Sequence, residues 1–149
     1  MQDYLLISSD KDDPGGFRLP AYKCVIDAIS AEIWNLYHRT SYKNKITEGD
    51  RVFFYIAGQK VYAGHIIGHA TVGNDTKDTG LHDQFGGEVS RSFHLIDPQL
   101  YDVPFNLRPR INELSIGSKA ATAGNRWGSI LMGGAKKLTE LDAEIIMRT

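Results

Sequence analysis

Aromatic side chains stand next to basic ones at two places in this sequence. One place is a short stretch that contains Trp34, Tyr37, His38, Arg39 and Tyr42. The other is Arg126-Trp127, in a segment rich in Gly and Asn. Flat aromatic faces beside cations are what base stacking and phosphate contact require. Ordinary packing is the alternative, with Trp34 in a core and Trp127 as a cover over the end of a barrel.

The histidines do not form a metal-binding motif. His65 and His69 are four residues apart, which on a helix would put both on one face. Their glycine-containing segment is predicted as a strand, where four residues span about 13 Å at roughly 3.3 Å per residue. Phosphate-loop, dinucleotide and nucleophile-elbow motifs are absent, and His82-Asp83 is typical of a solvated turn. We therefore expect no metal, no cofactor and no catalytic residue.

Cys24 is the only cysteine in the 149 residues, so an internal disulfide is excluded. Its apolar neighbours indicate a buried small side chain rather than a nucleophile. A single cysteine fits a reducing compartment, and no apolar run reaches the ~20 residues of a membrane span. The first residues also lack the basic and apolar regions of a signal peptide. We expect a soluble, cytoplasmic protein with no membrane partner.

The net charge of −1 argues at first against a nucleic-acid partner. The charge is unevenly distributed, however, because residues 38–51 sum to +2 and residues 103–137 to +5. Acidic segments at 1–16 (−3) and 74–102 (−4) balance them. The two basic segments either converge on one face or are scattered over the surface, and the sequence leaves both possibilities open.

Periodicity predicts the elements that must position these residues. Residues 4–9, 51–57, 61–72 and 93–96 have the apolar and β-branched content of strands. Residues 27–39 have apolar side chains at helical spacing, with Asp27 or Ser30 as the N-cap. Pro98, Pro104 and Pro109 are expected to interrupt the chain, and residues 111–116 to form a short helix or strand. Residues 73–87 are predicted as a long loop.

A capping box at Thr139–Asp142 predicts a last helix that runs through Met147. Gly64 and Gly68 within the second long strand suit a strand that coils sharply, as small barrels require. We found neither an internal repeat nor a linker. The sequence therefore predicts one α+β domain over 1–149, a small twisted β-barrel flanked by helices.

The order of the motifs resembles the EVE domain of the PUA-like superfamily, which is related to YTH and ASCH domains. The resemblance rests on Tyr4–Ser8, Ile46–Tyr55, Tyr62–Gly64, Ile111–Leu114, Arg126–Gly128, Met132–Gly134 and Leu138–Ile145. It covers nearly the whole chain in order. One departure is Ser8-Ser9-Asp10-Lys11, where family members usually carry Asn and then Trp after the first strand.

This resemblance implies a pocket between the barrel and the first helix that holds a flipped or modified base. The pocket residues implied are Ser8, Ser9, Trp34, Tyr37, Tyr55, Ile56, Ala57 and Trp127. Phosphate contacts are expected from Arg39, Lys43, Lys45, Arg108, Arg110 and Arg126. The function predicted is non-enzymatic binding of DNA or RNA, with the oligomeric state left open.

Two other functions remain open from the sequence. One is a ribonuclease or nucleotide-processing enzyme of the ASCH type, which would need a base near a cation, for instance His38 with Arg39 or Lys43. The other is a module that binds a small molecule or a protein through the same pocket.

Overall fold

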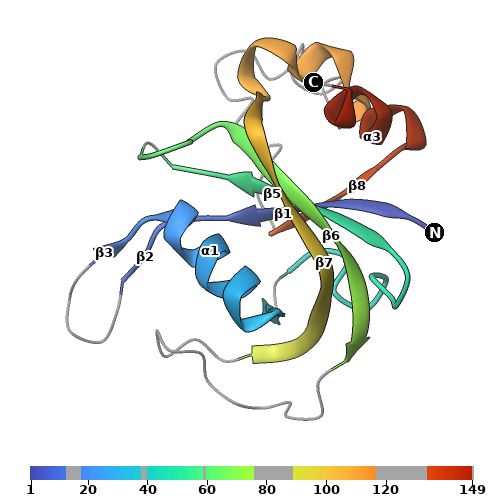
Figure 1. Ribbon diagram of the computed structural model, residues 1–149. Helices are drawn as coiled ribbons and strands as arrows, with labels where there is room; N and C mark the ends of the chain where they lie inside the picture. The colour runs from blue at the N-terminus through green and yellow to red at the C-terminus, as the bar shows by residue number, and fades with distance from the viewer. Residues whose placement is uncertain (13–17, 38–39, 59, 76–88, 117–133, 149) are drawn as a thin grey trace.

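The computed structural model describes residues 1–12, 18–37, 40–58, 60–75, 89–116 and 134–148. The chain forms a curled six-stranded sheet with short helices against both of its faces (Figure 1). The strand order is β4-β7-β6-β5-β1-β8. These strands are β1 (Asp3–Ser8), β4 (Ile33–Tyr37), β5 (Arg51–Ile56), β6 (His65–Asp75), β7 (Val89–Asn106) and β8 (Ala135–Leu138). Strands β1 and β5 are parallel, and all other neighbours in this sheet are antiparallel.

Shorter elements complete the described fold. Strands β2 (Lys11–Asp12) and β3 (Arg18–Leu19) form a two-stranded ribbon. Helix α1 (Ala21–Ala31) follows it, and a 3-10 helix η1 (Arg108–Glu113) and helix α3 (Glu140–Met147) lie near the C-terminus. Within the described residues, no helix is long and apolar enough to cross a membrane.

Alternating side chains divide the core between the two faces of the sheet, because successive residues of a strand point to opposite faces. On β5, Val52, Phe54 and Ile56 face one cluster, which also holds Val25 of α1. Phe53 and Tyr55 face a second cluster, built from η1 and α3 with residues that include Ile111, Leu114 and Ile146. Helix α1 therefore covers one face, while η1 and α3 cover the other.

The helix predicted over 27–39 is wrong in position. Helix α1 begins earlier, after Pro20, and its first N–H, at Ala21, donates to Asp10 Oδ1 at 2.9 Å. Asp27 and Ser30 are thus interior helix residues rather than N-caps. The helix ends at Glu32, which takes the left-handed conformation with φ 59°. The next residues form β4, because their β-branched and aromatic side chains suit a strand and pair with β7.

Strand β7 is longer than predicted and continues through Pro98 and Pro104. Strand β4 pairs only with its first part, from Val89 to His94. Further along, β7 pairs with β6 on one side and the register shifts repeatedly. Proline has no N–H to donate, so it is tolerated where a strand has a free edge or a bulge. Pro98 and Pro104 therefore do not end β7, because its position in the sheet tolerates them.

Other predictions agree with the structure. The strands at the N-terminus and at 51–57 are confirmed as β1 and β5, and the capping box of α3 is present at Thr139 and Asp142. The second long strand is confirmed but begins at His65, because residues 61–64 form a turn. Residues 73–75 belong to β6, and the rest of the predicted long loop lies outside the described residues. The segment 111–116 begins within a 3-10 helix.

Candidate ligand-binding site

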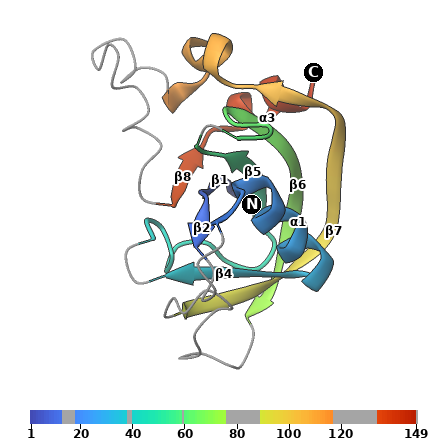
Figure 2. The ribbon, with the colours of Figure 1, turned by 90° about the vertical axis from the view of Figure 1, so that its left-hand side faces the viewer.

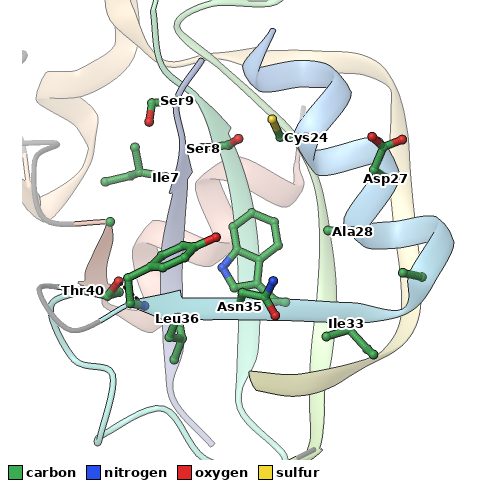
Figure 3. A pocket seen from close by; sticks show the side chains of 14 residues that line it. Ile7, Ser8, Ser9, Cys24, Asp27, Ala28, Ile33, Asn35, Leu36 and Thr40 are labelled. Carbon is green, nitrogen blue, oxygen red and sulfur yellow. Dashed lines mark hydrogen bonds between the residues drawn. The ribbon is translucent and has the colours of Figure 1, made fainter. Parts of the chain in front are cut away.

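A cavity of about 520 Å³ opens between the end of β1, helix α1 and strand β4 (Figure 3). This volume lies within the ~300–1,000 Å³ that is usual for small-ligand pockets. The lining is mostly apolar, with a few polar groups that enter from each element. The residues that line it are Ile7, Ser8, Ser9, Cys24, Asp27, Ala28, Ala31, Ile33, Trp34, Asn35, Leu36, Tyr37, Thr40 and Gly134.

Hydrogen bonds fix the end of β1 against the start of α1. The buried Ser8 Oγ donates to the carbonyl oxygen of Ala21 at 3.0 Å. Asp10 accepts from the N–H of the same residue, as described above. The Asp10 carboxylate thus satisfies one of the N–H groups that have no partner within the helix, and its negative charge is favourable at the helix N-terminus. These two hydrogen bonds therefore fix the position of the end of β1 relative to the start of α1.

Strand β4 supplies the aromatic wall and one amide. Trp34 packs against Phe54 with ring centroids 5.3 Å apart, and it is only partly buried. Asn35 Oδ1 accepts from Ser92 Oγ at 2.8 Å. The N–H of Tyr37 donates to Thr40 Oγ1 at 3.0 Å, which closes the turn after the strand. The bond to Ser92 holds the Asn35 amide in place, and packing on Phe54 holds the Trp34 ring.

The electrostatic character of the pocket comes from one acidic group. Among the described residues that line it, Asp27 alone is charged, and its carboxylate lies 3.0 Å from Lys23 Nζ. Both side chains of this ion pair are substantially exposed. No group of three or more metal-ligating side chains occurs in the described part of the chain. The described lining suits an uncharged or cationic ring better than a phosphate.

Four of the predicted pocket residues line this cavity, namely Ser8, Ser9, Trp34 and Tyr37. The lining does not include Tyr55, Ile56 or Ala57. Tyr55 points into the second core cluster instead, because it alternates with Phe54 along β5. Burial raises the pKa of the Tyr55 phenol, and the neighbouring Arg108 guanidinium partly opposes this. Trp127 lies outside the described residues, as do His38 and Arg39.

The predicted phosphate-binding residues are not all near this cavity. Lys43 and Lys45 lie in the turn after β4, which follows Thr40, and Lys43 Nζ donates to Ser90 Oγ at 3.3 Å. Arg108 and Arg110 lie on η1, which packs with α3 on the other face of the sheet, away from α1 (Figures 1 and 2).

Arg110 is also paired with Glu113, with Nε 2.8 Å from Oε2. Its guanidinium carbon lies 4.7 Å from the centre of the Phe105 ring. Arg126 lies outside the described residues. Of the basic residues that the structure describes, those after β4 and those on η1 therefore do not form one face.

Sequence reasoning missed several lining residues, among them Cys24, Asp27, Asn35 and Thr40. On α1, positions 24, 27, 28 and 31 recur at helical spacing and line the cavity together. A helix placed at 21–31 would have revealed this stripe, whereas a helix placed at 27–39 hides it. Cys24 is half-buried in the wall of the cavity rather than deep in the core, which corrects the expectation from its apolar neighbours.

Comparison with known proteins gives matches only at the level of structure. No protein-family model matches the sequence, and no curated protein matches it. A structure from Agrobacterium tumefaciens has a TM-score of 0.57 and 12% identity, covering 99% of this chain and 92% of its own. One from Pseudomonas putida has a TM-score of 0.57 and 14% identity, covering 98% and 97%.

Human THYN1, in complex with DNA that contains 5-methylcytosine, has a TM-score of 0.55 and 12% identity, covering 99% of this chain and 96% of its own. At these identities the likeness establishes the fold. The curled sheet with its short helices is the PUA-like α+β barrel that the resemblance to EVE domains predicted. This chain therefore has the PUA-like fold that it shares with these proteins.

Proposed function

We propose that this protein is a non-enzymatic nucleic-acid-binding domain that holds a flipped, modified base in the cavity between β1, α1 and β4. The observation that carries the proposal is the position of Trp34, an aromatic wall beside the polar groups of Ser8 and Asn35. The same fold in human THYN1 occurs in a complex with methylated DNA, which supports the proposal.

The cavity has the size and the lining that a base requires. Its volume of about 520 Å³ exceeds that of a single base, which leaves room for a substituent on the ring. Stacking of a base on an aromatic side chain is worth about 1–3 kcal/mol. Bases are read in such pockets by hydrogen bonds to their polar edge together with stacking. Ser8 and Asn35 would supply the hydrogen bonds, and Trp34 the stacking surface.

Phosphate contacts would come from the basic residues of the turn that follows Thr40. Thr40 lines the cavity, and Lys43 and Lys45 follow within five residues on the same turn. Lys45 is exposed, so its ammonium can reach a backbone phosphate. Arg108 and Arg110 lie on the opposite face of the sheet. We therefore assign the phosphate contacts to Lys43 and Lys45 and give η1 no role in binding.

The test uses the single cysteine as a reporter of the cavity. Cys24 lines it, and no other cysteine exists in the sequence. Short DNA and RNA strands with and without modified bases are titrated by fluorescence anisotropy at low salt. In parallel, the rate of Cys24 alkylation is followed by mass spectrometry. A strand with a modified base should bind more tightly than the unmodified strand, and it should slow the alkylation of Cys24 more strongly.

The outcomes separate the open functions. A folded protein that binds no strand at low salt would refute nucleic-acid binding. Binding without protection of Cys24 would place the nucleic acid elsewhere and refute the role of the cavity. Cleavage of labelled strands would favour an enzyme instead. As a control, alkylation is repeated on Trp34→Phe, which keeps an aromatic wall and should show protection similar to that of the unchanged protein.

A further inference from the structure

Two basic segments of the chain meet at the wall of the cavity and continue beyond it. One is the turn 40–46 after β4, and the other is the start of β8 with the residue before it. Thr40 and Gly134 both line the cavity, and a Cβ atom at Gly134 would lie 3.2 Å from the Thr40 side chain (Figure 3). Residues 40–46 and 134–138 contain no acidic residue and four basic ones, namely Lys43, Lys45, Lys136 and Lys137.

Tyr42 supplies an aromatic ring outside the cavity but close to it. The residue is 39% exposed, and its ring centre lies 5.7 Å from that of the buried Tyr4. Tyr4 precedes Ile7, which lines the cavity, by three residues on β1. Three residues of a strand span about 10 Å. The Tyr42 ring is therefore supported by the core on one side, reaches solvent, and lies near the cavity wall.

The turn that carries Tyr42 is held in one conformation. Its carbonyl oxygen accepts from the N–H of Lys45 at 2.8 Å and from that of Ile46 at 3.1 Å. Arg91 of β7 donates from Nη1 to the carbonyl oxygens of Lys43 and Ile46. Tyr42 has a φ of 59°, which is uncommon for an aromatic residue and persists only where the surroundings impose it. A ring fixed in this way loses little conformational freedom when it stacks on a base.

The sheet register places one lysine of β8 beside this ring. Lys137 is directly opposite Tyr4 in the antiparallel pairing of β1 with β8, and opposite residues share one face of the sheet. Lys136 pairs with Leu5 and so lies on the other face, because successive residues of a strand alternate. Lys137 and Lys45 are both exposed. Two free ammonium groups therefore accompany the exposed ring.

The acidic residues nearest in sequence to the turn do not neutralise these lysines. Asp50 is buried, and its carboxylate accepts from the N–H groups of Gln2 at 3.0 Å and Thr47 at 2.9 Å. Glu48 is exposed, but it is a single carboxylate against two exposed ammonium groups. An aromatic ring beside exposed cations is the arrangement with which proteins bind single-stranded nucleic acid.

We propose that Tyr42, Lys45 and Lys137 form a second binding surface, the Tyr42 surface, for the unpaired nucleotides next to the base in the cavity. Tyr42 stacks on one of these bases, and the two lysines contact phosphates. The proposal rests on the proposed base pocket and adds the form of the partner, which is a single strand. A base inside a duplex has both faces covered by its neighbours, so only an unpaired base can stack on Tyr42.

The test removes one base at a time from the nucleic acid. Single-stranded DNA with one 5-methylcytosine carries an abasic residue one, two or three nucleotides to either side, since a stacked strand advances about 3.4 Å per nucleotide. At one of these positions the loss of the base should weaken binding about fivefold or more, and at the others less than about twofold. Equal affinities for the whole series would overturn the proposal.

Tyr42→Ala should weaken binding of the complete strand to the same extent. With this variant the abasic residue should cause no further loss, because ring and base act as one interaction. Tyr42→Phe is the matched control and should bind like the unchanged protein, since it keeps the ring. Melting temperatures of both variants show whether the contact with Tyr4 matters for stability. An abasic penalty that persists in a folded Tyr42→Ala protein would contradict stacking on Tyr42.

The two lysines of β8 give a second matched pair. Lys137→Ala should lower the affinity for every strand and reduce the slope of log K against log salt by about 1. Lys136→Ala should change neither, because its side chain lies on the other face of the sheet. Equal effects of the two substitutions would contradict the phosphate contact at Lys137.

Protection of Cys24 against alkylation, followed with each strand, separates this proposal from the proposed function. If the modified strand protects Cys24 but binds Tyr42→Ala as tightly as the unchanged protein, the base pocket stands and the Tyr42 surface is refuted. If the abasic residue and Tyr42→Ala weaken binding together while Cys24 stays unprotected, the Tyr42 surface stands and the base pocket is refuted. A strand that does not bind at low salt refutes both.

Discussion

Trp34 combines a structural contact with a place in the cavity wall. It packs on Phe54 in the core beneath α1, and it also lines the cavity. The sequence left open whether Trp34 is a core residue or a stacking residue, and the structure shows a partly buried ring that contacts the core and also lines the cavity. A substitution here therefore changes both stability and any stacking interaction, and the two effects must be measured separately.

Trp34→Ala should weaken binding of a modified strand by about 1–3 kcal/mol, because the stacking surface is lost. It should also lower the free energy of unfolding through the cavity left beside Phe54. Anisotropy titration and urea unfolding measure the two effects. Trp34→Phe should retain most of both. Unchanged affinity in a folded Trp34→Ala protein would contradict the stacking role.

His69 lies on the other face of the sheet, in a partly buried aromatic environment. Its Nδ1 is 2.8 Å from the Tyr101 hydroxyl oxygen, and its ring packs near Phe53. Burial lowers the pKa of His69 below its ordinary value, Arg51 lowers it further, and Asp3 opposes the shift. The folded protein therefore favours the neutral imidazole.

Stability should fall as the pH drops below about 6.5, the ordinary histidine pKa. Below about pH 6.5 the unfolded chain binds a proton at His69, whereas the folded chain keeps the imidazole neutral down to its lowered pKa. The contribution of His69 to the free energy of unfolding is therefore complete above about pH 6.5 and declines as the pH falls toward the pKa of the folded state. Melting temperatures from pH 7.5 to 5.5 measure this slope. His69→Gln should have a shallower slope, and an identical slope would contradict the assignment.

At the scale of elements, the close approach of β6 and β7 shapes the curl of the sheet. The register between them shifts three times, and each shift bends the strands. Gly68 lies at one of these shifts, where a Cβ atom would collide with the backbone carbonyl oxygen of Gln99. Gly73 lies further along the same strand, where a Cβ would meet the movable end of the Ile96 side chain at 3.0 Å.

Gly68→Ala should therefore destabilise the protein by more than about 2 kcal/mol, because backbone must shift to make room. Gly73→Ala should cost clearly less, because its nearest contacts are side-chain atoms of Ile96 and His94 at 3.0–3.1 Å rather than backbone at 2.2 Å. Chemical unfolding of the two variants gives the comparison. If both variants lost the same free energy of unfolding, the contact between Gly68 and the Gln99 carbonyl would not be what requires glycine at position 68.

Across the whole molecule, a net charge of −1 limits any non-specific attraction to nucleic acid. The described basic residues are also separated in the fold, with Lys43 and Lys45 in the turn after β4 and Arg108 and Arg110 on η1, on the other face of the sheet. Affinity for a strand must then come mainly from the cavity and from few phosphate contacts.

Binding should accordingly depend only weakly on salt. Lys45→Ala should lower affinity for all strands alike and reduce the slope of log K against log salt by about 1. Arg108→Ala should leave both unchanged, because η1 lies on the opposite face. Titrations between low and moderate salt test this. If Arg108→Ala lowered the affinity as much as Lys45→Ala does, the nucleic acid would also contact η1.

Local sequence was enough to predict the elements whose signals are strong and uncontested. Strand β5 has an unbroken β-branched and aromatic run, and Thr139 with Asp142 specifies the start of α3. The order of motifs also predicted the barrel. For β5 and α3, the interactions that determine the element join residues close in sequence. For the barrel, the order of the motifs along the chain is distinctive enough to indicate the fold.

The tertiary structure alone decided where the first helix ends and which side chains meet in the cavity. Residues 33–37 have apolar spacing that suits either a helix or a strand, and pairing with β7 selects the strand. That choice moves α1 to 21–31 and turns Cys24 and Asp27 toward the cavity. The same alternation that brings Phe54 beneath Trp34 turns Tyr55 away. These outcomes depend on contacts between residues far apart in sequence, so no local pattern could specify them.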